Sequence, residues 1–153
     1  MKADCGFSLV DMLLSLAIWA IVIAIALPNF IGLLDSANLQ QTALQVVSDL
    51  RSQQIRAERF QTYQEVRFAP FNNYYLLYGN GTGYEGFKIF VWPTHYFDGY
   101  LHLNYPTVRF DDNGDINESG QIGFSDSFGH TQNIVIYLQY GDMRLIPHMI
   151  MGT

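Results

Sequence analysis

Two patterns of hydrophobic residues divide the first sixty positions of the chain. From Phe7 to Leu27 the 21 residues are almost all apolar, and Asp11 is their only charge. As a helix, this segment would be about 30 Å long, which matches the hydrocarbon thickness of a membrane. Further along, apolar residues recur at the helical period, interrupted only by Gln53, at Leu39, Ala43, Val46, Leu50, Ala57 and Phe60. The sequence therefore predicts a membrane-length helix over 7–28 and an amphipathic helix over 29–60.

Pro28 lies between the two predicted helical segments, and Gly32 follows it closely. Proline removes a hydrogen bond from a helix interior, and glycine weakens one. We therefore expect a helix kink at Pro28 and a bend or weak point near Gly32.

After residue 60 the period changes from that of a helix to that of a strand. Short runs rich in aromatic and β-branched residues alternate with Gly, Pro, Asn and Asp. The predicted strands are 65–68, 73–78, 87–92 (a buried strand), 100–103, 107–110, 121–124, 133–140 and 143–146. The predicted connections include a glycine-rich loop over 79–86, a loop over 93–99 and a two-residue turn at Gly141 and Asp142. Residues 61–153 should thus form a small antiparallel sheet or sandwich, and the whole chain an α+β fold.

Composition and charge narrow the classes of function that the chain could have. The chain has 11 Phe and 10 Tyr and a net charge of −6. Beyond residue 60 the chain has four basic and nine acidic residues. An acidic domain gains little from releasing counterions from a phosphate backbone, so DNA binding by the isolated domain is disfavoured. Cys5 is the single cysteine, so a chain that loses its first residues cannot form a disulfide.

The apolar N-terminal segment has several interpretations. Lys2 and the small residues around Ala24 and Ala26 resemble an ordinary secretory signal, but Asp4, Asp11 and Pro28 do not suit one. A plain membrane anchor explains the length. Its difficulty is Asp11, because a carboxylate in lipid costs about 2 kcal/mol or more. An acid in the first turn of a helix, near the interface, would explain Asp11 but not the residues before it.

The residues from Gly6 to Leu14 read Gly-Phe-Ser-Leu-Val-Asp-Met-Leu-Leu. This string resembles the processing motif of type IV prepilins and pseudopilins, which usually reads glycine, phenylalanine, threonine, leucine, isoleucine, glutamate. Two positions differ, because Ser8 replaces threonine and Asp11 replaces the longer glutamate. Pro28 also stands where that family often has a helix-kinking proline.

The resemblance implies a processing pathway for the N-terminus. Prepilin peptidase would cut between Gly6 and Phe7, remove residues 1–6 as a leader and methylate the amine of Phe7. Asp11 would then pair with the Phe7 amine of a neighbouring subunit. An opposite charge is what a carboxylate in an apolar filament core requires. The implied partners are other pilins or pseudopilins, prepilin peptidase, the membrane platform of the assembly machine and membrane lipid.

Diffuse patterns over 40–146 are similar to the GspH/FimT group of minor pseudopilins. They include the segment around Asp49, the run from Val108 to Gly114 and the terminal hairpin at Gly141. Members of this group serve type II protein secretion, type IV pili or DNA-uptake competence, and one sequence does not separate these systems. The resemblance implies a structural subunit in the cytoplasmic membrane, single-pass, with its C-terminal domain outside the cytoplasm. The rival hypotheses are a DNA-binding minor pilin, for which Arg144 alone is a thin match, and a secreted protein.

Candidate chemistry beyond this resemblance is sparse. Asp111, Asn113 and Asp115 alternate like calcium ligands, but Ile116 and Ile122 replace the residues of an EF-hand loop. We expect a solvated acidic turn, with weak calcium binding as the alternative and no other cofactor. The histidines (His95, His102, His130 and His148) show no metal-ligand spacing. Ser125, Asp126 and His130 lie too close in sequence for a catalytic triad, so no enzyme is expected.

Overall fold

The computed structural model describes residues 9–70, 72–79, 83–98, 106–116, 119–137 and 142–147. Within these residues, a long helix precedes eight strands. The helix is α1 (Leu9–Phe60); the strands are β1 (Gln64–Phe68), β2 (Tyr74–Gly79), β3 (Gly83–Ile89), β4 (His95–Asp98), β5 (Thr107–Phe110), β6 (Gly120–Ser125), β7 (Thr131–Ile136) and β8 (Met143–Pro147). The chain forms two compact units, Met1–Leu34 and Asp35–Thr153. The boundary thus lies six residues after Pro28.

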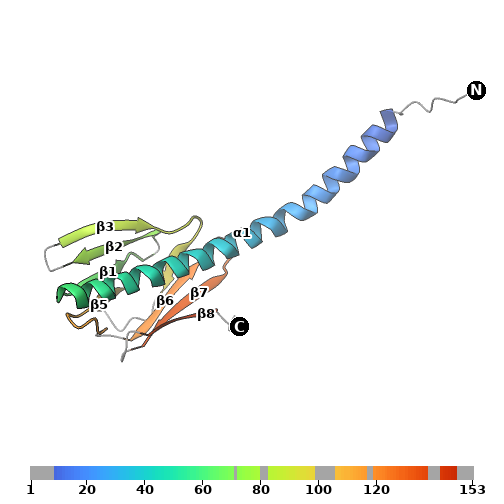
Figure 1. Cartoon of the computed structure of the whole chain (residues 1–153). Helices are drawn as coiled ribbons and strands as arrows, with labels where there is room; N and C mark the ends of the chain where they lie inside the picture. The colour runs from blue at the N-terminus through green and yellow to red at the C-terminus, as the bar shows by residue number, and fades with distance from the viewer. Residues whose placement is uncertain are drawn as a thin grey trace, which may run out of the picture. The chain divides into compact units, whose positions relative to one another are not determined.

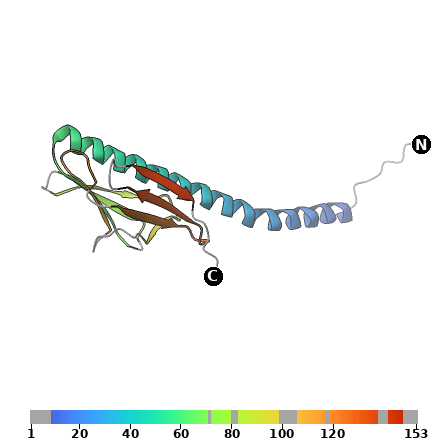
Figure 2. The ribbon, with the colours of Figure 1, turned by 90° about the horizontal axis from the view of Figure 1, so that it is seen from below.

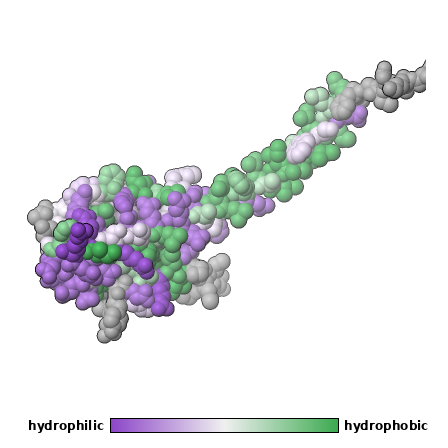
Figure 3. All heavy atoms as spheres, in the orientation of Figure 1, coloured by the Kyte–Doolittle hydropathy of each residue, from purple (hydrophilic) through white to green (hydrophobic). Residues whose placement is uncertain are grey.

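The described part of the first unit is the apolar half of α1. The helix continues through Pro28 and Gly32, so neither residue ends it. The side-chain amide of Asn29 bonds to the helix backbone, since its Nδ2 donates to the carbonyl of Ile25 at 3.4 Å. The helix is long and apolar enough to cross a membrane. Figure 3 shows hydrophobic residues along this half of α1.

The second unit begins with the amphipathic half of α1, and the predicted stripe is largely confirmed. Leu39, Ala43, Val46, Leu50 and Ala57 are buried. Gln53, which interrupts the stripe in sequence, is also buried. The prediction for Phe60 was wrong, because its side chain is 59% exposed. Phe60 is the last residue of the helix.

A backbone cap ends α1 directly after Phe60. Gln61 has a φ of 50°, and the N–H of Thr62 donates to the carbonyl of Ala57 at 3.2 Å. A left-handed residue followed by this bond is a common helix end. The chain therefore leaves the helix after Phe60 and enters β1 at Gln64.

Two antiparallel four-stranded sheets complete the second unit. Their strand orders are β3-β2-β1-β5 and β4-β6-β7-β8. Figures 1 and 2 show the second half of α1 running along both sheets, so the α+β prediction is confirmed. The core between helix and sheets is rich in aromatic rings. Ring centroids lie 5.3 to 6.4 Å apart among Phe68, Tyr75, Phe90, Tyr96 and Phe124.

Several predicted strand boundaries need correction. The loop predicted for 93–99 was wrong, because it contains β4, where His95 pairs with Ser125 and Tyr96 is buried. Pairing with β6 outweighs the local turn-forming residues. The glycine-rich loop is shorter than predicted, since β3 already begins at Gly83.

Strand β3 also differs from the prediction of a buried strand over 87–92. It ends at Ile89, and Phe87 and Ile89 are more than half exposed. Phe87 and Ile89 alternate along the strand with Lys88, whose side chain contacts Asp49 of α1, so they lie on the sheet face away from the helix. Strand β7 lies at Thr131–Ile136, earlier than predicted. The predicted strand 100–103, residues 138–140 and Gly141 lie outside the described residues.

Candidate functional site

The first candidate site is the exposed apolar surface of α1 between Leu9 and Leu34. Every large hydrophobic side chain in this range is exposed, from 46% at Ile31 to 76% at Leu9. A soluble monomer rarely exposes such a continuous apolar surface, so this surface is expected to contact lipid or protein. Gly6 and Phe7, the predicted cleavage residues, lie outside the described residues.

Asp11 is the one carboxylate on this surface. It lies in the first turn of α1, where the helix dipole favours a negative charge. Its backbone carbonyl accepts a hydrogen bond from Ser15 Oγ at 2.7 Å. Within the described residues, its carboxylate has no ion-pair partner. Within the part of the chain that the structure describes, the Asp11 carboxylate is therefore exposed and open to a group from another chain.

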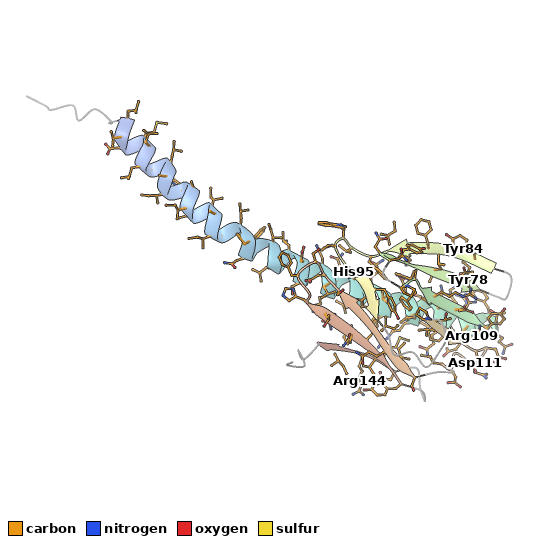
Figure 4. All side chains as sticks on the ribbon, turned by 180° about the vertical axis from the view of Figure 1, so that it is seen from behind. Tyr78, Tyr84, His95, Arg109, Asp111 and Arg144 are labelled. Atoms are coloured by element: carbon orange, nitrogen blue, oxygen red, sulfur yellow. The ribbon has the colours of Figure 1, made fainter. Side chains whose placement is uncertain are left out.

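A second candidate site, not predicted from the sequence, lies on the sheet formed by β3, β2, β1 and β5. The buried carboxylate of Glu65 accepts hydrogen bonds from Arg67 Nε and from Arg109 Nη2, the latter at 3.0 Å. The Arg67 guanidinium lies 4.4 Å from the ring centroid of Tyr78, a cation–π contact. This cluster borders a pocket of about 410 Å³ lined by Tyr63, Glu65, Arg67, Arg109 and Asp111. Figure 4 labels Arg109, Asp111 and Tyr78 on this part of the domain.

Strand alternation explains the cluster. Glu65 and Arg67 are two residues apart on β1, and Arg109 pairs with Glu65 across the sheet. The three side chains therefore share the sheet face opposite the buried Val66 and Phe68. The alternation of Glu65 and Arg67 was visible in the sequence, but their pairing with Arg109 required the register of β1 and β5.

The two arginines determine how Glu65 titrates. Burial alone would raise the pKa of Glu65, but the hydrogen bonds from Arg67 and Arg109 outweigh it and hold the pKa below its ordinary value of 4.5. The ion pairs therefore stabilise the fold above that pH, and this contribution is lost as the pH falls through the lowered pKa.

Glu65→Gln is expected to lower the free energy of unfolding at neutral pH by about 1–3 kcal/mol, because the buried partner of two arginines loses its charge. The difference from the wild-type chain should shrink as the pH falls below 4.5 and disappear once the pH is below the lowered pKa of Glu65. Urea unfolding at several pH values measures this. Glu85→Gln is the control, since the Glu85–Arg56 pair (2.7 Å) is partly exposed and should contribute less. An equal, pH-independent loss in both variants would contradict the assignment.

The predicted acidic turn is held together by Asp111. Its Oδ1 accepts hydrogen bonds from the N–H groups of Asn113 and Asp115 at 2.9 and 2.8 Å. Gly114 has a φ of 80°, and a Cβ there would lie 2.5 Å from Glu58 Cγ. Gln54 Nε2 donates to the Gly114 carbonyl at 3.0 Å. The turn thus packs on α1. Among the described residues, no three His, Cys, Asp or Glu side chains are placed to hold a metal ion.

Asp111→Ala is expected to lower the free energy of unfolding by about 1–2 kcal/mol, whether or not calcium is present, because two backbone N–H groups lose their acceptor. The exposed neighbour variant Asp112→Ala should have little effect. Thermal unfolding with calcium and with a chelator measures both. A calcium-dependent rise in melting temperature that Asp111→Ala abolishes would instead support the calcium-site alternative.

The three residues weighed as a triad, Ser125, Asp126 and His130, divide between two separate contacts. Ser125 Oγ lies 2.9 Å from His95 Nε2, whereas Asp126 Oδ2 lies 2.6 Å from His130 Nδ1. Asp126 Oδ1 also accepts from the N–H groups of Phe128 and His130 at 2.9 and 2.8 Å. Asp126 therefore holds the turn through its Oδ1 and contacts the His130 ring through its Oδ2. A catalytic triad needs a serine hydrogen-bonded to a histidine that is itself hydrogen-bonded to an aspartate, and these contacts do not form that chain.

Polar contacts also attach α1 to β2 and to the edge strand β3. Asp49 accepts hydrogen bonds from Tyr75 and from Lys88, and burial together with Asp49 raises the pKa of Tyr75. Arg56 binds Glu85 through two hydrogen bonds of 2.7 and 3.0 Å. These contacts join residues 26 to 39 positions apart, which no local pattern indicates.

Arg144, the residue considered for DNA contact, is occupied within its own hairpin. Its Nε donates to Asp142 Oδ2 at 2.9 Å, and its guanidinium lies 5.9 Å from the Tyr137 ring centroid. An arginine paired with a neighbouring carboxylate offers little net charge to a phosphate backbone.

Comparisons with known proteins give no relative: no family model matches the chain, and no significant match occurs among curated proteins or solved structures.

Proposed function

We propose that this chain is a structural subunit of a type IV filament machine, processed like a prepilin and assembled through the first half of α1. The observation that supports this most is the exposed apolar surface from Leu9 to Leu34, directly after the Gly6–Phe7 motif. The second half of α1, buried against two sheets, supports a folded domain attached to that helix.

In this proposal the chain first spans the cytoplasmic membrane, with its domain outside the cytoplasm. Cleavage after Gly6 then creates a charged amine at Phe7. The apolar half of α1 leaves the lipid and packs against the equivalent helices of neighbouring subunits. Moving an apolar helix between two apolar surroundings changes its free energy little, so assembly and disassembly are both feasible.

Asp11 has a specific role in this assembly. Its exposed carboxylate, unpaired within the described residues, would face the Phe7 amine of a neighbouring subunit. The pair would neutralise two charges that are costly in an apolar filament core. The resemblance to the GspH/FimT group supports a position as a minor subunit of a secretion, pilus or competence system.

Filament purification tests this function. Filaments sheared from cells that contain the assembly machine should include the chain. Filament-free preparations from cells without the assembly ATPase should not. Presence of the chain only in the soluble culture medium, independent of the machine, would contradict the proposal and favour a secreted protein.

The DNA-binding alternative has weaker support. The basic residues of the described domain are largely engaged, as with Arg67 and Arg109 on Glu65 and Arg144 on Asp142. Salt-dependent DNA affinity of the domain would be the result that favours it.

A further inference from the structure

Trp92 is the most exposed of the large hydrophobic residues that the structure describes, at 79%. Phe128 is also exposed, at 57%. An indole ring in water forgoes about 2 kcal/mol or more that burial would provide. Aromatic rings exposed to this degree on a folded domain suggest a contact surface.

These two aromatic residues lie at the same end of the domain. His95 at the start of β4 pairs with Ser125 at the end of β6, and the strands are antiparallel. Trp92 precedes His95 by three residues, and Phe128 follows Ser125 by three. Both loops therefore extend beyond the same end of this strand pair. Figure 4 shows His95 at the end of the domain away from Tyr84 and Asp111.

Hydrogen bonds attach the Trp92 loop to the beginning of the domain's helical segment. Asn38 Nδ2 donates to the Trp92 carbonyl at 3.2 Å, and the Val91 N–H donates to Thr42 Oγ1 at 3.2 Å. The turn with Phe128 is held by Asp126. Both aromatic residues thus project from fixed loops.

The apolar run ends only a few residues before Asn38. Asp11 and Asp35 enclose residues 12–34, which contain no charged side chain. These 23 residues make a helix of about 34 Å, enough to span the hydrocarbon layer with a modest tilt. Asn38 follows Leu34 by four residues, which reach at most about 14 Å when extended and about 6 Å as a helix. The headgroup region is about 5–8 Å deep on each side, so this short tether keeps the Trp92 loop within reach of it.

We propose that the Trp92 and Phe128 loops rest on the surface of the membrane that the apolar run enters, with Trp92 inserted at headgroup level. Tryptophan favours this zone because its ring is apolar and its N–H remains hydrated. The inference rests on the membrane anchoring in the proposed function.

The charges of the Trp92 and Phe128 loops indicate whether the contact needs anionic lipid. Residues 91–96 and 125–130 contain no Lys or Arg, and Asp126 is paired with His130. The contact therefore depends on the apolar interface and not on anionic lipid. It should persist in zwitterionic bilayers and at high salt.

The two tryptophans allow a direct test in the full chain, because Trp19 lies within the apolar run and Trp92 in the domain. The full-length chain is reconstituted in phosphatidylcholine vesicles with either a headgroup nitroxide or bromines deep in the acyl chains. Trp19→Phe leaves Trp92 as the reporter, and Trp92→Phe leaves Trp19. The control, Trp19→Phe/Trp92→Phe/Tyr84→Trp, places the reporter at an exposed position far from the Trp92 loop along the helix. Position 84 is next to Glu85, which pairs with Arg56. Arg56 is 18 residues beyond Asn38, which is about 27 Å of helix.

The expected result is strong quenching of Trp19 by the deep bromines. The headgroup nitroxide should quench Trp92 several-fold more than the tryptophan at position 84. Quenching of Trp19 together with equal, weak quenching at positions 92 and 84 would overturn the inference while the anchoring stands. Absence of quenching at Trp19 would overturn the anchoring itself. Both substituted tryptophans are exposed, so unfolding of the domain is not expected to obscure the result.

Discussion

Asp11→Ala should reduce incorporation into the filament about a hundredfold while cleavage after Gly6 proceeds normally. In the assembled state, the Phe7 amine of a neighbouring subunit would lose its counter-charge. A lone charge in an apolar medium costs about 2.5–3.5 kcal/mol, which corresponds to a factor of about 100 in the assembly equilibrium. Quantifying the chain in purified filaments and in the membrane fraction measures both steps.

Two further substitutions separate charge from size at this position. Asp11→Asn keeps the shape but removes the charge, so it should assemble as poorly as Asp11→Ala. Asp11→Glu keeps the charge and restores the acid usual in prepilins, so it should assemble at least as well as the natural chain. Normal incorporation of Asp11→Ala would show that the intersubunit pairing is wrong. Loss of cleavage in all three variants would show that the residue serves the peptidase.

Leu50→Ala should lower the free energy of unfolding of the domain by about 2–5 kcal/mol, through lost burial and the cavity that remains. Leu50 is fully buried at the contact of α1 with the sheets. Because small domains are stable by only about 5–15 kcal/mol, this is a large fraction of the total. Urea unfolding of the detergent-solubilised chain, followed by near-ultraviolet circular dichroism, measures the change in the domain without the signal of the apolar helix.

Leu44→Ala is the matched control for Leu50→Ala. Leu44 lies on the same helix but is 52% exposed. The two substitutions change helix propensity equally, so the difference between them reports packing. We expect less than about 1 kcal/mol for Leu44→Ala. Equal losses in the two variants would contradict the packing of α1 on the sheets.

The sequence predicted the helix and its buried stripe well because both depend on local period. Positions 39, 43, 46, 50, 53 and 57 recur every three or four residues, and all of them are buried, including the polar Gln53. The exceptions have tertiary causes. Phe60 is the last residue before the left-handed Gln61 that ends the helix, and its side chain is exposed. Strand β4 forms because β6 is beside it, and Phe87 and Ile89 are exposed because they lie on the face of β3 opposite Lys88, which contacts α1.

The candidate sites likewise divide into one that local sequence displays and others that depend on tertiary structure. Gly6, Phe7 and Asp11 form a short contiguous motif, which a sequence can display. Glu65 and Arg109 are 44 residues apart, and Asp49 and Lys88 are 39 apart. Those pairs depend on strand register and on the placement of α1, so sequence patterns alone did not reveal them. The role of Asp111 as an acceptor for its own turn likewise required the backbone geometry.

The intact mass of the chain from cells with an active prepilin peptidase tests the central claim most directly. We expect a protein that lacks residues 1–6 and has one added methyl group on Phe7, while cells without the peptidase retain the full chain. An uncut N-terminus in the presence of the peptidase would contradict processing as a prepilin. A cut near Ala26 would instead identify an ordinary secretory signal.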